Sequence, residues 1–153
     1  MKEIQFDRIK DAVAKLCIDA NCLLGDDIVQ AFKDGVKTEE SPAGKDILNQ
    51  LLDNEQIARK EMMPICQDTG WAVVWLKLGS GVRVQGGELY EAIQQGVAKG
   101  YTDGYLRKSI VEDPLRRKNT GNNTPAIIYT DIVPGDGLEL TVQPKGGGSE
   151  NMS

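Results

Sequence analysis

Apolar residues recur at a helical spacing through the first part of the chain. Over residues 6–24 they fall near a period of 3.6 residues, which is typical of an amphipathic helix. A glycine ends that pattern, and a shorter helix is predicted over 26–36. Ser41 is a favourable N-cap and Pro42 suits the first helical position, so a third and longer helix is predicted from there towards Met62.

The pattern changes at Pro64, which cannot continue a helix. Residues 71–79 are β-branched, aromatic and apolar, which predicts a buried strand, and residues 82–85 alternate as a second short strand. A fourth helix is predicted over 88–111, although three internal glycines weaken it. The polar stretch 113–125 is rich in Gly, Asn and Pro, as expected of a loop.

Two further strands are predicted at 124–133 and 138–144, on either side of the turn sequence PGDG. In the second of them, leucine and valine alternate with polar residues, which is typical of a strand with one buried face. The turn favours a hairpin, whose open edge would promote self-association. The predicted fold class is therefore α+β, with N-terminal helices followed by a small mixed or antiparallel sheet and a C-terminal hairpin.

The composition is that of an ordinary globular domain. The 153 residues suffice for one domain with a hydrophobic core, and 40% apolar with 27% charged residues argue against disorder. The formal charge of -5 disfavours a nucleic-acid or anionic-membrane surface but does not exclude a small anionic substrate. No apolar run approaches the ~20 residues of a membrane span, and the charged N-terminus lacks a signal-peptide core, so a cytoplasmic location is expected.

The cysteine and histidine content limits the kinds of disulfide, catalytic and metal site that the chain can form. Three cysteines are too few for a disulfide scaffold. Histidine is absent, which excludes Ser-His and Cys-His dyads and His-ligated zinc within this chain. Cys17 and Cys22 belong to the first predicted helix, about 140° apart around its axis, so they would not face one metal ion. A buried structural role is expected for both.

Cys66 differs from these two because it follows Pro64 in a predicted loop, beside Gln67 and Asp68. A free cysteine is most often a small buried hydrophobe. A functional thiolate is favoured here because loops concentrate functional residues, the neighbours are polar, and Gly70 permits a close backbone approach. Since no histidine is available as a base, metal ligation is the better functional interpretation. A nucleophilic cysteine with Asp68 as base is the alternative.

Two further features could contact an anion. Arg107 and its basic neighbours follow the fourth predicted helix, and they form either a solvated basic stretch or a clamp for a substrate carboxylate. The triplet Gly146, Gly147 and Gly148 lets successive backbone N–H groups converge on an anion, although the P-loop pattern is absent. The alternative interpretation of this triplet is a flexible tail.

Three motifs occur in a characteristic order: ICQDTG, GYLRKSIVEDPLRRKNTGNNTPA and IVPGDGLELTVQPKGGGSENMS. Together they resemble the iron–sulfur-dependent class I fumarases and L-tartrate dehydratases, most closely the N-terminal part of the α subunit in the two-subunit forms. The resemblance covers almost the whole chain. It implies reversible hydration or dehydration of a C4 dicarboxylate by a 4Fe-4S cluster that is held by three cysteines and whose open iron acts as a Lewis acid.

The resemblance also implies roles for individual residues. Cys66 matches the first cluster ligand. The residues that match substrate contacts are Gln67, Asp68, Arg107, Gly146, Gly147 and Gly148, with the arginine binding a carboxylate and the glycines approaching through their backbone. Residues 149–151 continue the glycine motif, and the catalytic base is implied to lie in the β-type region of the family.

The family's α subunit continues beyond residue 153 of this sequence and supplies two more cluster cysteines there. We therefore expect residues 1–153 to be the N-terminal portion of a hydro-lyase catalytic domain, inactive and cluster-free when alone. The implied partners are a β subunit of the same enzyme and a small dicarboxylate, in a homo- or hetero-oligomer. The sequence does not separate fumarate from tartrate, and a non-catalytic folding or assembly module is the alternative function.

Overall fold

Three consecutive helices form the first part of the chain in the computed structural model, which describes residues 1–148. They are α1 (Phe6–Cys22), α2 (Asp26–Thr38) and α3 (Pro42–Glu61), close to the predicted ranges. The Ser41 hydroxyl accepts a hydrogen bond from the Gly44 N–H at 3.3 Å, which confirms the predicted N-cap of α3. The helix ends where Met62 adopts a left-handed conformation, with φ of 50°, two residues before Pro64.

The other elements are mainly strands. They are β1 (Lys2–Gln5), β2 (Trp71–Gly79), β3 (Val82–Gln85), α4 (Leu89–Asp103), β4 (Ile127–Val133) and β5 (Leu138–Lys145). β1 pairs in parallel with β3, and its four residues are too few for a periodic pattern to reveal it from sequence. The helix predicted to reach residue 111 ends at Asp103, because the Gly104 N–H closes its last turn and Tyr105 has a positive φ of 52°.

A three-stranded mixed sheet has the order β4–β2–β5, so the predicted pairing of a C-terminal hairpin is wrong. β2 lies between the two strands and pairs in parallel with β4 and antiparallel with β5. The PGDG turn passes over the end of β2, where the Gly79 N–H donates to the Gly137 carbonyl at 2.8 Å and the Gly81 N–H to the Gly135 carbonyl at 2.7 Å. Turn residues indicate that the chain reverses, but they do not reveal a strand that fits between the two arms. The α+β class itself is confirmed.

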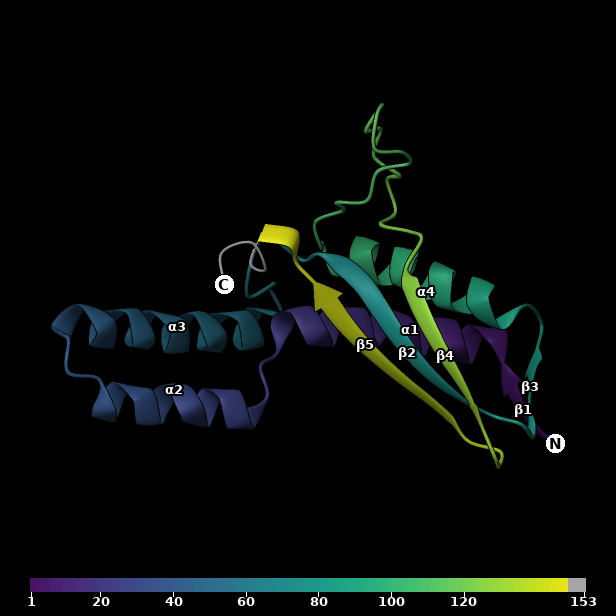
Figure 1. Cartoon of the computed structure of the whole chain (residues 1–153), viewed down its shortest axis with the longest axis horizontal. Helices are drawn as coiled ribbons and strands as arrows, with labels where there is room; N and C mark the ends of the chain where they lie inside the picture. The colour runs from purple at the N-terminus through teal and green to yellow at the C-terminus, as the bar shows by residue number, and fades with distance from the viewer. Residues whose placement is uncertain (149–153) are drawn as a thin grey trace.

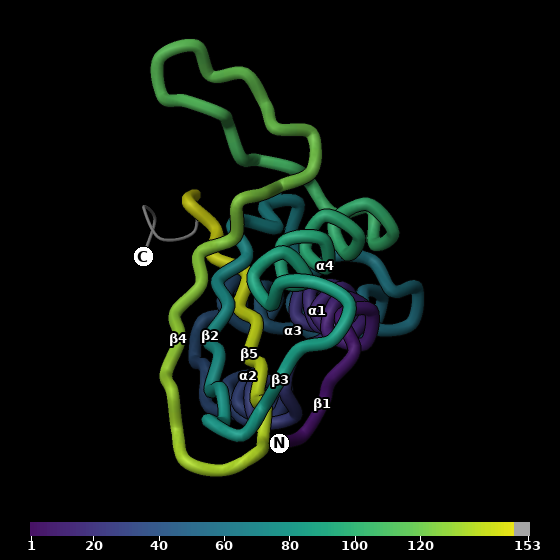
Figure 2. The backbone as a smooth tube through the Cα atoms, turned by 90° about the vertical axis from the view of Figure 1, so that its right-hand side faces the viewer, coloured from purple at the N-terminus to yellow at the C-terminus, as the bar shows by residue number. Residues whose placement is uncertain are grey.

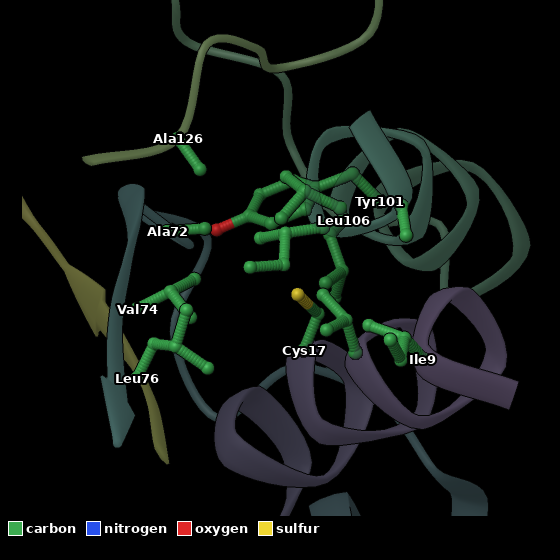
Figure 3. Packing of buried hydrophobic residues seen from close by; sticks show 12 residues of the cluster. Ile9, Cys17, Ala72, Val74, Leu76, Tyr101, Leu106 and Ala126 are labelled. Atoms are coloured by element: carbon green, nitrogen blue, oxygen red, sulfur yellow. The ribbon is translucent and has the colours of Figure 1, made fainter. Parts of the chain in front are cut away.

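The hydrophobic core lies between the sheet and the pair α1 and α4, as Figures 1 and 2 show. Ala72, Val74 and Leu76 of β2 point into it and meet side chains of both helices (Figure 3). The helices approach closely at Gly96 and Gly100, where an added Cβ would lie 2.6 Å from the Lys10 carbonyl and 2.7 Å from the Ala14 carbonyl. The glycines that weaken α4 as an isolated helix are therefore the residues that allow it to pack.

Helices α2 and α3 lie side by side and project away from the sheet (Figure 1). No residue of α2 is buried, and α3 leaves Ile47 58% exposed and Ile57 56% exposed. The pair is therefore held mainly by its own mutual contacts. Within residues 1–148, no helix combines the length and the apolar character that a bilayer span requires.

The Cys17 thiol and the Tyr101 hydroxyl are both buried in the core, and they predict a loss of stability at alkaline pH. Burial raises the pKa of the Cys17 thiol from 9.0 to about 12, and burial also raises the pKa of the Tyr101 hydroxyl above its ordinary 10.0. Because the thiol ionises first in the unfolded chain, its contribution is complete below pH 9.0 and is lost as the pH rises towards 12. The free energy of unfolding should fall by at most about 1.4 kcal/mol per pH unit from this group.

Urea unfolding between about pH 8 and pH 10 measures that slope. The Cys17→Ala variant is the control, since it should be less stable at every pH and should have a smaller slope in this window, where the Cys22 thiol and the Tyr101 hydroxyl supply the rest. An equal slope in the variant would contradict the assignment to Cys17.

Candidate functional site

The loop that carries Cys66 is fixed at its beginning by two helices. The Ile65 N–H donates to the Asn21 carbonyl at the end of α1, at 2.9 Å. The Asn54 side chain, on α3, donates to the Ile65 carbonyl at 2.9 Å. The residue before Cys66 is therefore hydrogen-bonded through both of its backbone groups.

The end of the same loop is fixed by buried side chains from α4 and the long loop that follows it. The Tyr101 hydroxyl donates to the Thr69 carbonyl at 2.7 Å and lies 3.1 Å from the Gly70 carbonyl. The Asn123 amide donates to the Gly70 carbonyl at 3.0 Å, and the Thr69 hydroxyl donates to the Arg107 carbonyl at 2.9 Å. These contacts leave the loop little freedom to move at its C-terminal end.

Asn123 is a structural residue that the sequence analysis missed. Its side chain is 0% exposed, and its carbonyl oxygen accepts from the N–H of Ser109 at 2.7 Å and of Ile110 at 3.3 Å. One amide thus joins the 104–126 loop to the start of β2. The run NNTP carries three residues that favour turns, and nothing in the sequence distinguishes Asn123 from Asn122 as the buried one.

Cys66 is exposed, so its interpretation as a small buried hydrophobe is wrong. Its sulfur accepts from the backbone N–H of Asp68 at 3.4 Å, a contact that leaves the thiol open to a ligand. Cys17 and Cys22 are buried, as predicted, and burial raises the pKa of both thiols. Cys66 is therefore the one accessible thiol of the three.

Asp68 connects two motifs that lie 80 residues apart in the sequence. One carboxylate oxygen accepts from the Gly70 N–H at 3.2 Å, and the other accepts from the Gly148 N–H at 3.1 Å. An added Cβ at Gly148 would lie 3.4 Å from the second oxygen, so the glycine allows a close approach. The carboxylate is held by these backbone donors and makes no hydrogen bond with the Cys66 thiol within the described residues, which weakens the case for Asp68 as the base of a nucleophilic cysteine.

Gly70 brings the loop against the end of β5. It has a positive φ of 60°, and an added Cβ would lie 2.4 Å from both the carbonyl carbon and the oxygen of Lys145. The close backbone approach predicted at Gly70 is confirmed, and the neighbouring backbone is that of a strand. This contact places the Gly146, Gly147 and Gly148 backbone directly beside the Cys66 loop.

Most of the predicted site residues meet at one hollow of about 480 Å³. Its lining residues include Cys66, Gln67, Asp68, Gly146 and Gly148, together with Asn21 near the end of α1 and Leu24 just after that helix. Gly147 instead lines a neighbouring hollow of about 380 Å³, which shares Asp68 with the first. The two hollows thus lie on either side of one carboxylate.

Arg107 lies outside the linings of both hollows, although its backbone is bonded to Thr69. Its side chain is exposed and makes no hydrogen bond or ion pair with another residue in the part of the chain that the structure describes. Residues 149–151, which continue the predicted glycine motif, lie outside the described residues.

Comparison with known proteins identifies the family of the chain. The family model described as fumarate hydratase (Fumerase) matches residues 10–153. The chain belongs to this family. The match takes in every residue of the fumarate hydratase family chain that was assigned to the candidate site.

Individual members of the fumarate hydratase family match most of the chain. A Methanocaldococcus jannaschii protein, provisionally named an L(+)-tartrate dehydratase subunit alpha, is 36% identical over 152 residues, 95% of this chain and 53% of its own. The Escherichia coli (strain UTI89) L(+)-tartrate dehydratase subunit alpha is 34% identical over 96% of this chain and 49% of its own. The anaerobic class I fumarate hydratase of Escherichia coli K12 is 39% identical over 75% of this chain and 21% of its own. The chain spans about half the length of the two α subunits.

The described residues of this family member do not form a metal site by themselves. Within residues 1–148, no group of three or more His, Cys, Asp or Glu side chains could hold a metal ion. A single accessible thiol lies in the hollow, which offers room and one soft ligand. A cluster with three thiolate ligands would need further cysteines from elsewhere.

Thiol alkylation should separate the three cysteines of this fumarate hydratase family chain. In the folded chain, Cys66 should react with iodoacetamide at a rate close to that of a free thiol, since it is exposed, and Cys17 and Cys22 should react only after unfolding. Mass spectrometry of peptides after a timed pulse measures the three rates, with a sample in urea as the control. Equal labelling of all three in the folded chain would contradict the structure.

Proposed function

We propose that this chain contributes substrate contacts and one cluster ligand to a hydro-lyase that adds water to, or removes it from, a C4 dicarboxylate. The observation that carries the proposal is the position of Asp68, which is bonded to the glycine loop in a hollow that also exposes Cys66. The names of the relatives support this reaction class, since they are tartrate dehydratase α subunits and a class I fumarate hydratase.

A 4Fe-4S cluster is the proposed cofactor, because the motifs of the chain resemble those of iron–sulfur-dependent hydro-lyases. Thiolates are its usual ligands, and Cys66 would hold one of its irons. When bound, the cluster would supply a Lewis acid for the hydroxyl and one carboxylate of the substrate. Since Cys17 and Cys22 are buried, the remaining ligands would come from outside residues 1–148. The chain alone is therefore expected to be cluster-free and inactive.

The residues around the hollow would bind and orient the diacid. Asp68 is held by the two backbone N–H groups, so its carboxylate is positioned before any substrate arrives. Gln67 is exposed in the same lining and could hydrogen-bond a substrate hydroxyl or carboxylate. The Arg107 guanidinium, exposed beside this loop, would pair with a carboxylate in a bidentate contact.

The same proposal includes the partners of the chain. Two of the relatives are named α subunits, which supports a β subunit as partner and an oligomer that contains both. The catalytic base is proposed to belong to that partner. We keep the cytoplasmic location as a prediction, and the choice between fumarate and tartrate depends on contacts that these residues do not define.

Reconstitution tests the proposed reaction. The chain is combined with the remaining α-subunit sequence and the β subunit, loaded with iron and sulfide without oxygen, and assayed for fumarate hydration and tartrate dehydration. Cys66→Ser should lose both the cluster absorbance and the activity. Asp68→Asn should keep the absorbance and lose about a hundredfold in kcat, since misplacing a substrate by about 1 Å can cost that much.

Asp131→Asn is the matched control, because it makes the same chemical change at an exposed carboxylate of β4. It should leave both readouts unchanged. A complex with a full cluster and no activity on fumarate or tartrate would contradict the proposal. It would favour the alternative of a non-catalytic assembly module.

A further inference from the structure

A hollow of about 360 Å³ lies beside β1 and the first turns of α1. Figure 1 shows this end of the molecule on the opposite side of the body from the projecting helices α2 and α3. We call it the β1–β5 hollow, and it is lined by residues 2–4 of β1, by Arg8, Ala12 and Leu16 of α1, and by Leu138 and Leu140 of β5. It shares no lining residue with the two hollows that contain Asp68, so it is separate from the candidate site.

The lining of the β1–β5 hollow is largely aliphatic. Leu140 pairs with Leu76 and Leu138 with Leu78 across the sheet, so both leucines of β5 point to the side of the sheet that faces α1. Within residues 1–148, β5 pairs only with β2 and β1 only with β3, so no strand closes the space between the two sheets. Ile4, Leu138 and Leu140 therefore stay half-buried, packed against the core on one side and open to the hollow on the other.

Positive charge predominates in the β1–β5 hollow, although the chain as a whole carries a charge of -5. Its lining contains two cations, Lys2 and Arg8, and one acid, Glu3. All three side chains are exposed, and none makes an ion pair or a side-chain hydrogen bond with another residue in the described part of the chain. Lys10, two residues after Arg8, pairs instead with Asp7. The Arg8 guanidinium is therefore available to an external anion.

We propose that the β1–β5 hollow binds a small monocarboxylate with an unbranched aliphatic tail. Arg8 pairs with the carboxylate, since its planar fork of N–H donors matches the two oxygens, and the leucines of α1 and β5 contact the tail. Pockets of roughly 300–1,000 Å³ that are mainly apolar, with a few polar groups, are the usual form of small-molecule sites. This site rests neither on the family nor on the proposed reaction.

The charges and the leucines together select this class of ligand. A dicarboxylate would bring its second charge to Glu3 or to the leucines, and both contacts are unfavourable. An aliphatic amine would meet the two cations, Lys2 and Arg8. A neutral alcohol would gain the apolar contacts but not the charge-assisted hydrogen bonds to the guanidinium. A monocarboxylate with an apolar tail is the class that satisfies both parts of the lining.

Methyl NMR of the whole chain tests the site with octanoate as the probe. The methyl signals that should shift saturably are those of Ile4, Leu16, Leu138 and Leu140. The Kd for octanoate should be about 1 mM or tighter. Hexanoate and butanoate should bind more weakly, by about threefold to fourfold for each methylene group removed. Succinate and octan-1-ol should bind at least about tenfold more weakly than octanoate. The methyl signals of Ile47, which is 58% exposed on α3, should stay in place.

Substitutions then separate the charge from the apolar contacts. Arg8→Gln should raise the Kd for octanoate at least about fivefold and leave the weaker binding of octan-1-ol unchanged. Arg83→Gln is the matched control, because Arg83 is also exposed but lies on β3, outside the hollow. Ala12→Phe fills part of the hollow and should weaken the binding of both ligands, whereas Ala43→Phe makes the same change on α3 and should weaken neither. Thermal melts by circular dichroism check that each variant is folded, and the arginine pair decides the result if Ala12→Phe is not.

Three results would overturn the proposal. The first is the absence of saturable shifts in the methyl signals of the hollow at about 10 mM octanoate. The second is an equal Kd for octanoate in the Arg8→Gln variant and the unchanged chain, since the carboxylate would then have no partner in Arg8. The third is displacement of octanoate by an equal concentration of succinate, which would make the hollow a dicarboxylate site. None of these measurements uses the hydro-lyase activity, so either proposal can fail while the other stands.

Discussion

Gly70→Ala should lower the free energy of unfolding by roughly 3–5 kcal/mol, through left-handed strain combined with an overpacked contact. The φ of 60° is unfavourable for alanine, and its Cβ would lie 2.4 Å from the Lys145 backbone. Neither backbone can yield easily, because the Gly70 carbonyl is bonded to Asn123 and Lys145 is paired with Trp71. Urea denaturation followed by circular dichroism measures the loss.

Gly121→Ala separates the two causes of that loss. Gly121 also has a positive φ, 78°, but nothing lies within 4 Å of an added Cβ. The Gly121→Ala variant should therefore lose only the part of the free energy of unfolding that comes from backbone strain, about 1 kcal/mol. Equal stability of the Gly70→Ala and Gly121→Ala variants would contradict the close contact between Gly70 and β5.

Asn123→Ala should cost roughly 3 kcal/mol or more, because it leaves buried backbone donors without partners. The side chain is 0% exposed and accepts from the N–H groups of Ser109 and Ile110 while donating to the Gly70 carbonyl. Alanine cannot replace any of these bonds, and the position is fully buried. The stability is measured by urea unfolding at neutral pH.

The neighbouring Asn122→Ala is the matched control. Asn122 is exposed and accepts from the N–H and hydroxyl of Thr124, so its loss should cost about 1 kcal/mol. A double-mutant cycle of Asn123→Ala with Tyr101→Phe should show coupling, since both side chains approach the Gly70 carbonyl. Strictly additive losses would indicate that the two side chains do not support the loop together.

The helices and the loop thiol were predictable because their signals are local. An N-cap at Ser41, the apolar period of α1 and the polar neighbours of Cys66 each depend on a few adjacent residues. The placement of β2 between β4 and β5 was not predictable, because pairing across the chain depends on which arrangement buries Leu138, Leu140 and Val142 best. Periodicity identifies the buried face of a strand but not its neighbours.

The candidate site shows the same division. Cys66, Gln67 and Asp68 are adjacent in the sequence, and the family motif identified them together. The contact between Asp68 and Gly148 arises only because β5 returns along β2, and the roles of Tyr101 and Asn123 arise only from burial. The role of a residue that depends on long-range packing cannot be predicted from its neighbours in the sequence.

The insertion of β2 between β4 and β5 has a consequence for synthesis on the ribosome. β2 leaves the ribosome well before residues 127–145. Both of its hydrogen-bonding edges therefore remain unpaired until β4 and β5 have been translated. An apolar strand with two free edges is a target for chaperones and a source of aggregation. Rare codons or a stall between residues 79 and 127 should therefore reduce the soluble yield more than the same delay placed within α2 or α3.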